Sequence, residues 1–207
     1  MVLCYTVCIC KKKVMYGGDK KFMRVIAGIA KGHKLEAPEG LTTRPTTDRI
    51  KETLFNMMAF DLPECKFLDL FSGSGAIGIE ALCRGAAEAV FVDSHKEAQN
   101  VIHKNLAHTK LSEKATVLGK DVFIALQELS AAGKVLDIIY MDPPYAAGVE
   151  QTVLEAIRCG GLLNKDGYIG VEHGSQYPLR IPAGYRLARE KSYKTTTITF
   201  LVLEETE

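Results

Sequence analysis

No apolar run in the sequence approaches the roughly 18 residues that a membrane-spanning helix requires. There is also no C-x-x-C pair: three of the six cysteines lie near the N-terminus, and no matching second cluster of metal ligands follows them. Scattered cysteines are typical of a protein in a reducing compartment. We therefore expect a cytoplasmic protein with no membrane contact and no metal site. Its hydrophobic fraction of 47% suffices for the core of one full domain.

Charge nearly cancels, since the formal net charge is +1, but its distribution is uneven. Residues 1–51 carry 11 Lys or Arg against 4 Asp or Glu, whereas the remainder is acidic. A basic N-terminal part on an acidic body indicates an anionic partner, although a solvated basic tail would have the same composition. Residues 1–22 begin apolar and then become basic, the reverse of a secretory signal. We expect them to be a poorly ordered extension, or to reflect a translation start placed too early.

Residues 23–60 are expected to form an N-terminal hairpin and a helix. We predict strands at 24–28 and 33–36, joined by a turn at Lys31-Gly32. After the break at Pro45, a threonine can cap a helix with an apolar stripe at helical spacing. A solvated hairpin is the simple alternative to a functional one. The basic residues of this unit that we select as candidates for phosphate contacts are Arg24, Lys31, Lys34, Arg44 and Arg49.

From residue 66 onward, strand-like and helix-like segments alternate, which indicates an α/β fold with a parallel sheet covered on both faces. The expected strands are 67–71, 89–92, 116–118, 136–141 and 168–171. The expected helices are 76–84, 95–108, 121–131 and 149–158. The last two strand-like runs, 185–190 and 196–203, have no helix between them. We expect them to form an antiparallel hairpin at the edge of the sheet.

A glycine-rich loop follows the first expected strand of this sheet and opens a helix. Gly73, Gly75 and Gly78 satisfy G-x-G-x-x-G, and Asp93 ends the next strand 20 residues after Gly73. This spacing matches a dinucleotide-binding fingerprint, with Asp93 placed for a ribose hydroxyl. The motif alone is a weak signal, and it is the only support for a nicotinamide dehydrogenase.

Two acids favour S-adenosylmethionine over NAD as the cofactor. Asp69 ends the strand before the glycine loop, where a carboxylate would repel a pyrophosphate but suit an ammonium and a sulfonium. Asp142 ends another strand, and no hydride-transfer partner accompanies it. We expect Asp93 to bind the ribose and Asp121 to accept from the adenine amino group, although each acid could instead cap a helix. The loop residues expected to approach the cofactor are Phe71, Gly73, Ser74 and Gly75.

The tetrad Asp142-Pro143-Pro144-Tyr145 follows the apolar run 135–141. Neither proline has an N–H to donate, so the strand must stop there. What remains at its end is a carboxylate, a proline carbonyl and an aromatic ring. In open parallel sheets this end faces the ligand crevice. A plain strand-ending turn is the alternative.

These two motifs together resemble class I S-adenosylmethionine-dependent amino-methyltransferases. The stretch 43–49, with Glu52 and residues 54–56, resembles more closely the bacterial small-subunit (16S) ribosomal RNA guanine-N2 methyltransferases, as does the entry 24–28. The resemblance covers about residues 23–203. It implies a Rossmann-like, seven-stranded, mostly parallel sheet with an antiparallel last strand. It also implies an RNA-binding element in residues 23–60 and a catalytic domain in 61–207.

The resemblance implies a reaction at an exocyclic amine of a base swung out of its stack. Asp142 and the Pro143 carbonyl would accept the two N–H bonds, and Tyr145 would stack on the base. The partner would be ribosomal RNA or a partly assembled small ribosomal subunit, and we expect a monomer. The runner-up is a DNA adenine or cytosine amino-methyltransferase, which shares the tetrad but usually needs an additional recognition segment. An RNA-binding module without turnover would leave Asp69 and Asp142 unexplained.

Overall fold

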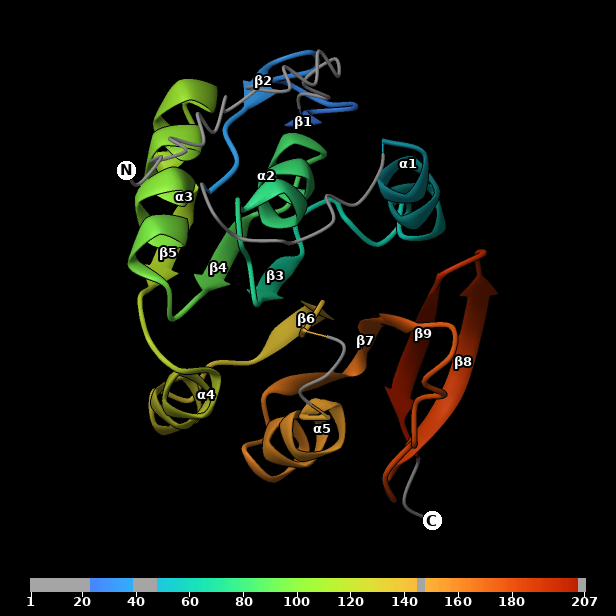
Figure 1. The fold of residues 1–207 in the computed structure, drawn as a ribbon. Coiled ribbons are helices and arrows are strands. Elements are labelled where there is room, and N and C mark those ends of the chain that lie inside the picture. Colours follow the sequence, from blue (N-terminus) through green and yellow to red (C-terminus); the bar gives the residue numbers. More distant parts are fainter. Residues whose placement is uncertain (1–22, 39–47, 145–147, 205–207) are drawn as a thin grey trace, which may run out of the picture.

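The computed structural model describes residues 23–38, 48–144 and 148–204, so predicted site residues Arg44 and Tyr145 and the extension 1–22 lie outside the described part. Seven strands form one sheet in the order β5-β4-β3-β6-β7-β9-β8 (Figure 1). In chain order they are β3 (Lys66–Leu70), β4 (Glu88–Val92), β5 (Ala115–Leu118), β6 (Leu136–Met141), β7 (Leu163–Gly174), β8 (Tyr185–Ser192) and β9 (Thr196–Leu203).

Neighbouring strands from β5 to β7 are parallel, and β9 runs antiparallel to both β7 and β8. The predicted seven-stranded sheet with an antiparallel last strand is therefore confirmed. Five α-helices and a short 3-10 turn are present among the described residues: α1 (Asp48–Met57), α2 (Ala76–Cys83), α3 (Lys96–Thr109), η1 (Ser112–Lys114), α4 (Val122–Ala131) and α5 (Glu150–Cys159). Within the described ranges, no helix combines the length and apolar character needed to cross a bilayer.

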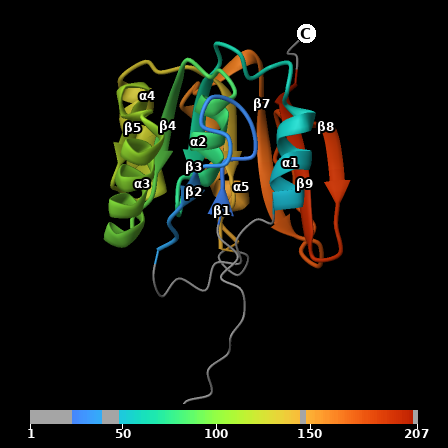
Figure 2. The same cartoon turned by 90° about the horizontal axis from the view of Figure 1, so that it is seen from above.

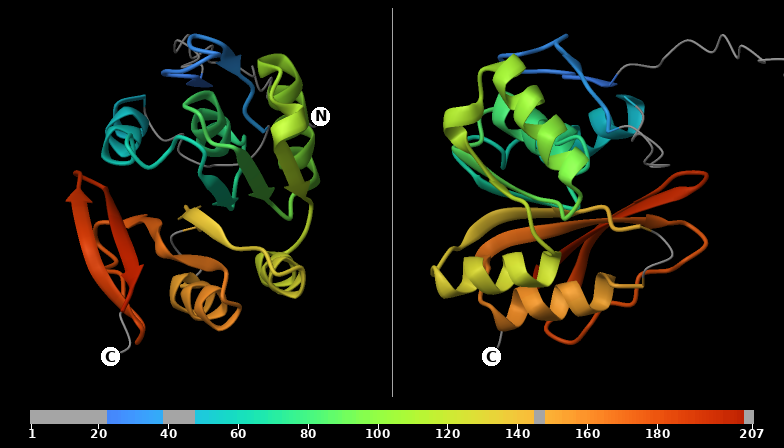
Figure 3. Two further views of the ribbon diagram at one scale, coloured as in Figure 1. Left: turned by 180° about the vertical axis from the view of Figure 1, so that it is seen from behind. Right: turned by 60° about the vertical axis from the view of Figure 1, so that its left-hand side comes forward.

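Helices cover both faces of the sheet, as the alternating pattern predicts. α2 and α3, with the N-terminal hairpin, lie over one face, and α4 and α5 lie over the other (Figures 1 and 3). Along β6, Ile138 and Tyr140 pack into the first layer, whereas Ile139 and Met141 pack into the second. This period of two is the reason for the continuous apolar run in the sequence: both faces of the strand are buried.

The N-terminal hairpin is shorter than the sequence suggests. Its strands are β1 (Met23–Arg24) and β2 (Lys34–Leu35). The predicted strand 24–28 is wrong beyond its first residue, because the backbone N–H groups of Ile26 and Ala27 donate to the Glu80 carboxylate at 2.8 and 2.9 Å. The chain is thus bound to α2 rather than continued as a strand.

β7 is longer than the predicted strand 168–171. It extends to Gly174 because β9 pairs with it up to Thr196. Its first residue, Leu163, pairs with Leu136 of β6, and a register shift separates this pair from the next. The extension carries Glu172 and His173 into the strand, at the same edge of the sheet as the end of β6.

Candidate active site

The C-terminal ends of the parallel strands place the four predicted acids at one edge of the sheet. Asp69 lies in β3, and Asp93, Asp121 and Asp142 follow β4, β5 and β6. From β3 the chain first adds β4 and β5 on one side of β3, and then returns to add β6 and β7 on the other side. The point of reversal therefore lies between β3 and β6, where open α/β sheets form their ligand crevice. Figure 2 looks down on the face of the sheet that α1, α2 and α3 cover, so this edge is seen in profile.

The glycine loop leaves β3 through a strained turn. Phe71 has a φ of 60°, in the left-handed region that aromatic residues seldom adopt and that costs about 1–3 kcal/mol. Ser72 holds the turn in place: its Oγ donates to the Asp69 carbonyl at 2.6 Å and accepts from Val92 N–H at 2.9 Å. Such strain tends to persist at functional sites because the surrounding structure over-determines it.

The glycines of the fingerprint have distinct roles. A Cβ added to Gly73 would meet no atom of the described residues within 4 Å, so this part of the structure leaves the backbone open to a ligand. A Cβ on Gly78 would lie 2.3 Å from the Phe91 ring, so glycine is required for α2 to pack against β4. In the dinucleotide-binding motif, too, one glycine lets the backbone approach the ligand and another lets the helix pack closely against the strand.

The two acids predicted for the adenosine portion are already engaged with the protein. Asp93 is nearly buried, and its Oδ2 accepts from Gly73 N–H at 2.9 Å while its Oδ1 accepts from His95 N–H at 2.9 Å. Oδ1 also lies 3.1 Å from His95 Nδ1, whereas Oδ2 has a second lone pair for a ligand hydroxyl. Asp121 caps α4, because its side chain accepts from Phe123 N–H at 2.9 Å, and it remains exposed. The ligand roles of both acids stay predictions.

Asp69 lies beneath the glycine loop and is only 2% exposed. Its Oδ2 accepts from Gly78 N–H at 2.9 Å. Burial raises the pKa of this carboxyl to about 7, an effect that the Gly78 hydrogen bond partly offsets and the charge of Asp93 reinforces. Near neutral pH the loop therefore rests on an acid that takes up or releases a proton.

Asp142 belongs to a group of carboxylates that includes one residue absent from the sequence predictions. Burial raises its pKa well above the ordinary value, and the charges of Glu172 and Asp69 act in the same direction. Glu172 is buried on β7 and accepts a hydrogen bond from the Tyr140 hydroxyl. The sequence could have identified Glu172 as a candidate, because it is an acid inside the apolar run that begins at Tyr168. Its partner Tyr140 could not be identified from the sequence.

The predicted phosphate contacts are distributed along the N-terminal unit. Arg24 pairs with Lys34 across the hairpin and forms a 3.0 Å salt bridge with Asp48 at the start of α1. Arg49 is exposed on the first turn of that helix. Lys31 lies in the hairpin turn, which packs against the C-terminal end of α2. The structure thus places Arg24 beside Lys34 and against the start of α1, where Arg49 is exposed, whereas Lys31 lies in the turn at the C-terminal end of α2.

Comparison with known proteins gives extensive matches. Residues 23–202 match the family described as Conserved hypothetical protein 95. A candidate rRNA methyltransferase of Bacillus subtilis is 37% identical over 177 residues, which cover 85% of this chain and 96% of the relative. The ribosomal RNA small subunit methyltransferase D of Escherichia coli is 35% identical over 181 residues, covering 87% of this chain and 89% of the relative.

A solved structure agrees with these matches. A methyltransferase candidate of Escherichia coli superposes with a TM-score of 0.77 at 30% identity, covering 88% of this chain and 98% of that one. The resemblance to small-subunit ribosomal RNA methyltransferases is therefore confirmed, and the chain belongs to the family described as Conserved hypothetical protein 95.

Proposed function

We propose that this chain transfers a methyl group from S-adenosylmethionine to the exocyclic N2 amine of a guanine in small-subunit ribosomal RNA. One observation carries the proposal. The glycine loop after β3 and the Asp142-Pro143 pair after β6 end adjacent parallel strands, at the point where the strand order reverses. Open α/β sheets bind their ligands at such a point. The relatives named as rRNA methyltransferases supply the substrate class.

The residues at this edge fit the cofactor. Gly73 leaves its backbone open to a ligand, and Asp93 beside it has a lone pair left on Oδ2 for a ribose hydroxyl. Asp69 supplies negative charge beneath the loop for the ammonium and the sulfonium, and the exposed Asp121 is available to the adenine amino group. When bound, S-adenosylmethionine supplies an electrophilic methyl group on its sulfur.

The chain's own residues orient the amine and accept its proton. The Asp142 carboxylate and the Pro143 carbonyl accept the two N–H bonds, which aims the nitrogen lone pair at the methyl carbon. During methyl transfer from the bound cofactor, these two oxygens would stabilise the positive charge that develops on the amine nitrogen. The proton that nitrogen loses passes to Asp142, whose raised pKa favours holding it. Tyr145 stacks on the base, and Pro144 ends the strand.

The partner is ribosomal RNA, either free or in a partly assembled small subunit, which a monomer of this chain meets in the cytoplasm. Support for RNA binding comes from the basic N-terminal unit, where exposed Arg24 and Lys34 pair across the hairpin and Arg24 contacts Asp48, the neighbour of exposed Arg49. Arg44, which lies outside the described residues, is proposed for the same role in phosphate binding on its sequence alone. Cationic side chains grouped in this way bind phosphates and release counterions.

Replacing Asp142 tests the mechanism directly. Asp142→Ala removes an acceptor of the amine and should lower kcat on undermodified small subunits by roughly a hundredfold or more. Cofactor affinity, measured by calorimetry, should stay close to wild type because Asp142 belongs to the base-binding side. The matched control is Asp166→Ala, an exposed acid near the opposite end of the sheet. Full activity of the Asp142 variant would refute the assignment.

An amino-methyltransferase acting on DNA is the second candidate, because the tetrad itself does not distinguish guanine from adenine or cytosine. Labelled methyl transfer to undermodified small subunits and to duplex DNA, measured side by side, separates the two. Mapping of the labelled nucleotide then identifies the base. Label in DNA alone would establish the second candidate.

A further inference from the structure

A cavity of about 500 Å³ lies between the start of α5 and the segment that follows β7. Its lining includes Gly148, Glu150, Gln151, His173, Tyr177 and Arg180. Because β7 is parallel to β6, the cavity is at the same edge of the sheet as Asp142. Its volume is within the range of ordinary small-ligand pockets.

The walls of this cavity are held in place before any ligand arrives. His173 bonds to the Tyr177 carbonyl through Nδ1 at 2.9 Å and to Thr199 Oγ1 through Nε2 at 2.9 Å. Ser175 ties the same segment to the β8–β9 turn, because its Oγ donates to the Tyr193 carbonyl at 3.0 Å. Both nitrogens of the histidine are thus used by the protein, which makes His173 a support of the segment.

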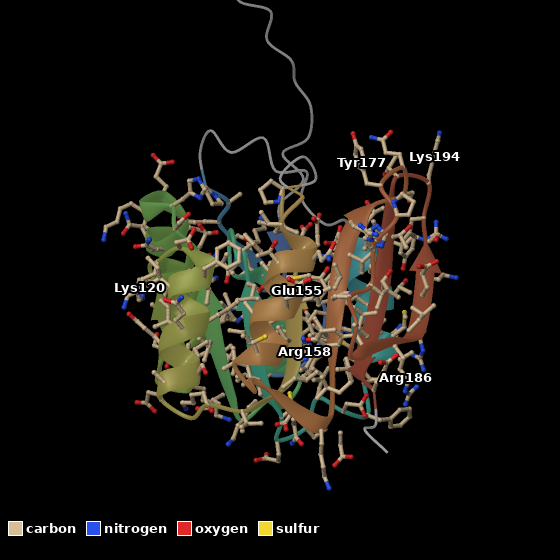
Figure 4. All side chains as sticks on the ribbon, turned by 90° about the horizontal axis from the view of Figure 1, so that it is seen from below. Lys120, Glu155, Arg158, Tyr177, Arg186 and Lys194 are labelled. Carbon is tan, nitrogen blue, oxygen red and sulfur yellow. The ribbon has the colours of Figure 1, made fainter. Side chains whose placement is uncertain are left out.

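An aromatic ring and several cations surround the cavity. Tyr177 is 54% exposed, although aromatic side chains of this size are usually buried to a greater extent. Arg180 lines the cavity, and Lys191 and Lys194 are exposed on the adjoining β8–β9 unit. In the described part of the chain, none of these three cations forms an ion pair. Figure 4 shows Tyr177 and Lys194 at the same end of the sheet, with Arg186 at the other end of β8.

An exposed aromatic ring flanked by cations is the usual combination for an unstacked, single-stranded nucleotide. The ring stacks on the base, and the cations bind the backbone phosphates. The acceptors Glu150 and Gln151 in the wall can meet amino groups of a base. Enzymes that swing a base out of its stack also contact the nucleotides that flank it, and a surface beside the target pocket is the place for such a contact.

We propose that this cavity binds the nucleotide adjacent to the methylated guanine, with Tyr177 stacked on its base and with Arg180 and Lys194 at its phosphates. The inference rests on the proposed function and extends it, because it places a second RNA contact across the crevice from the basic N-terminal unit. The occupant is RNA next to the target base, and its binding energy positions that target at Asp142. Tyr177 is therefore a positioning and binding residue, not a catalytic one.

The first test measures the affinity of the full chain for an RNA oligonucleotide that spans the target, together with KM and kcat on small subunits. Tyr177→Ala should weaken RNA binding and raise KM by roughly 5- to 100-fold, the range expected for loss of one base stack. Tyr177→Phe keeps the ring and should behave as wild type. The matched control is Phe60→Ala, an aromatic residue that is 98% exposed ahead of β3.

The second test uses two cations at opposite ends of β8. Lys194→Ala should lower the slope of log K against log salt by about 0.7, as expected for the loss of one phosphate contact to single-stranded RNA. Arg186→Ala, near the start of β8 and thus at the far end of the same hairpin, should leave the slope unchanged. Equal effects of the two variants would show a general loss of charge and would overturn the proposed placement.

The outcomes separate this inference from the proposed function. If wild-type protein methylates small subunits but Tyr177→Ala keeps wild-type KM and RNA affinity, the cavity assignment is overturned and the enzyme assignment stands. If wild type transfers no methyl group, the proposed function fails, while the affinity of the variants for RNA still decides the cavity. Weakened binding in Tyr177→Phe would also contradict the stacking role. Cofactor affinity measured in every variant should equal that of wild type.

Discussion

Asp69 links the stability of the protein to pH at the scale of a single residue. Its folded pKa is about 7, against an ordinary value of 3.8, because burial disfavours the charged form. The folded state therefore holds this proton more tightly than the unfolded state does. The stabilising contribution of the group is complete below about pH 4 and is lost as the pH rises to about 7, beyond which it stays constant.

Replacing Asp69 by Asn should remove this dependence. Asparagine keeps an acceptor for Gly78 N–H without the buried charge, so at pH 8 the variant should exceed wild type in free energy of unfolding by up to about 4 kcal/mol. Below pH 4 the difference should vanish. Urea unfolding of both proteins at pH 4, 6 and 8 measures the effect. A variant that is less stable than wild type at all three values would contradict the assignment.

The acids at this edge of the sheet show which residues of a site can be identified from a sequence. Asp69, Asp93, Asp121 and Asp142 could be identified because each ends a strand or follows one directly, and strand ends meet at one edge. The hydrogen bond from Tyr140 to Glu172 could not be predicted, because it depends on the register between two strands that are far apart in the chain. The sequence therefore supports the selection of candidate groups more readily than their hydrogen-bond partners.

At the scale of elements, the fully buried Glu80 joins three segments. Its carboxylate accepts from the hairpin backbone, lies 3.2 Å from Lys51 of α1 and forms a salt bridge with Arg84. Lys51 is also buried, and its Nζ donates to the Arg24 carbonyl. Burial lowers the pKa of Lys51, and the charge of Glu80 opposes that shift. The N-terminal unit is thus bound to α2 through a buried ionic network.

Glu80→Gln should be strongly destabilising, because it leaves the Lys51 ammonium buried without its counterion. Loss of one partner of a buried pair costs about 3–5 kcal/mol. The double variant Glu80→Gln with Lys51→Met should recover part of this loss, as a double-mutant cycle by urea unfolding will measure. Glu36→Gln, which removes one partner of the exposed pair with Lys104, is the control and should cost under about 1 kcal/mol. Additive effects in the Glu80–Lys51 cycle would argue against the network.

This network explains why the hairpin could not be predicted, whereas the core elements were predictable for another reason. β6 agrees with its predicted range of 136–141 because burial on both faces imposes an uninterrupted apolar run. The predicted strand at 24–28 has a suitable composition, but its amides at Ile26 and Ala27 bond to a glutamate 54 and 53 residues away. Local pattern carries no information about such a distant side chain.

At the scale of the whole molecule, the edge that carries the strand ends separates two cationic surfaces. The basic N-terminal unit lies on one side, and the β8–β9 unit with Lys191 and Lys194 lies on the other (Figures 1 and 4). The bias of residues 1–51 toward Lys and Arg made the first surface predictable. The second could not be recognised, because its cations lie within a part of the chain that is acidic in sum. Only the folded arrangement brings them to the crevice.

Binding that depends on cations on both sides of the crevice should weaken steeply as salt rises. Each phosphate contact contributes about 0.7–0.9 to the slope of log K against log salt, so Arg49→Ala should lower that slope by about this amount. Lys165→Ala, an exposed cation near the start of β7 and hence at the opposite edge, should leave it unchanged. Filter binding of target RNA between 50 and 200 mM salt, the range over which ~6–10 contacts change affinity by ~10³–10⁵, measures both slopes. If the affinity of the wild-type protein for RNA did not change with salt, the cations at this edge would not bind RNA phosphates. That conclusion would hold whichever base is methylated.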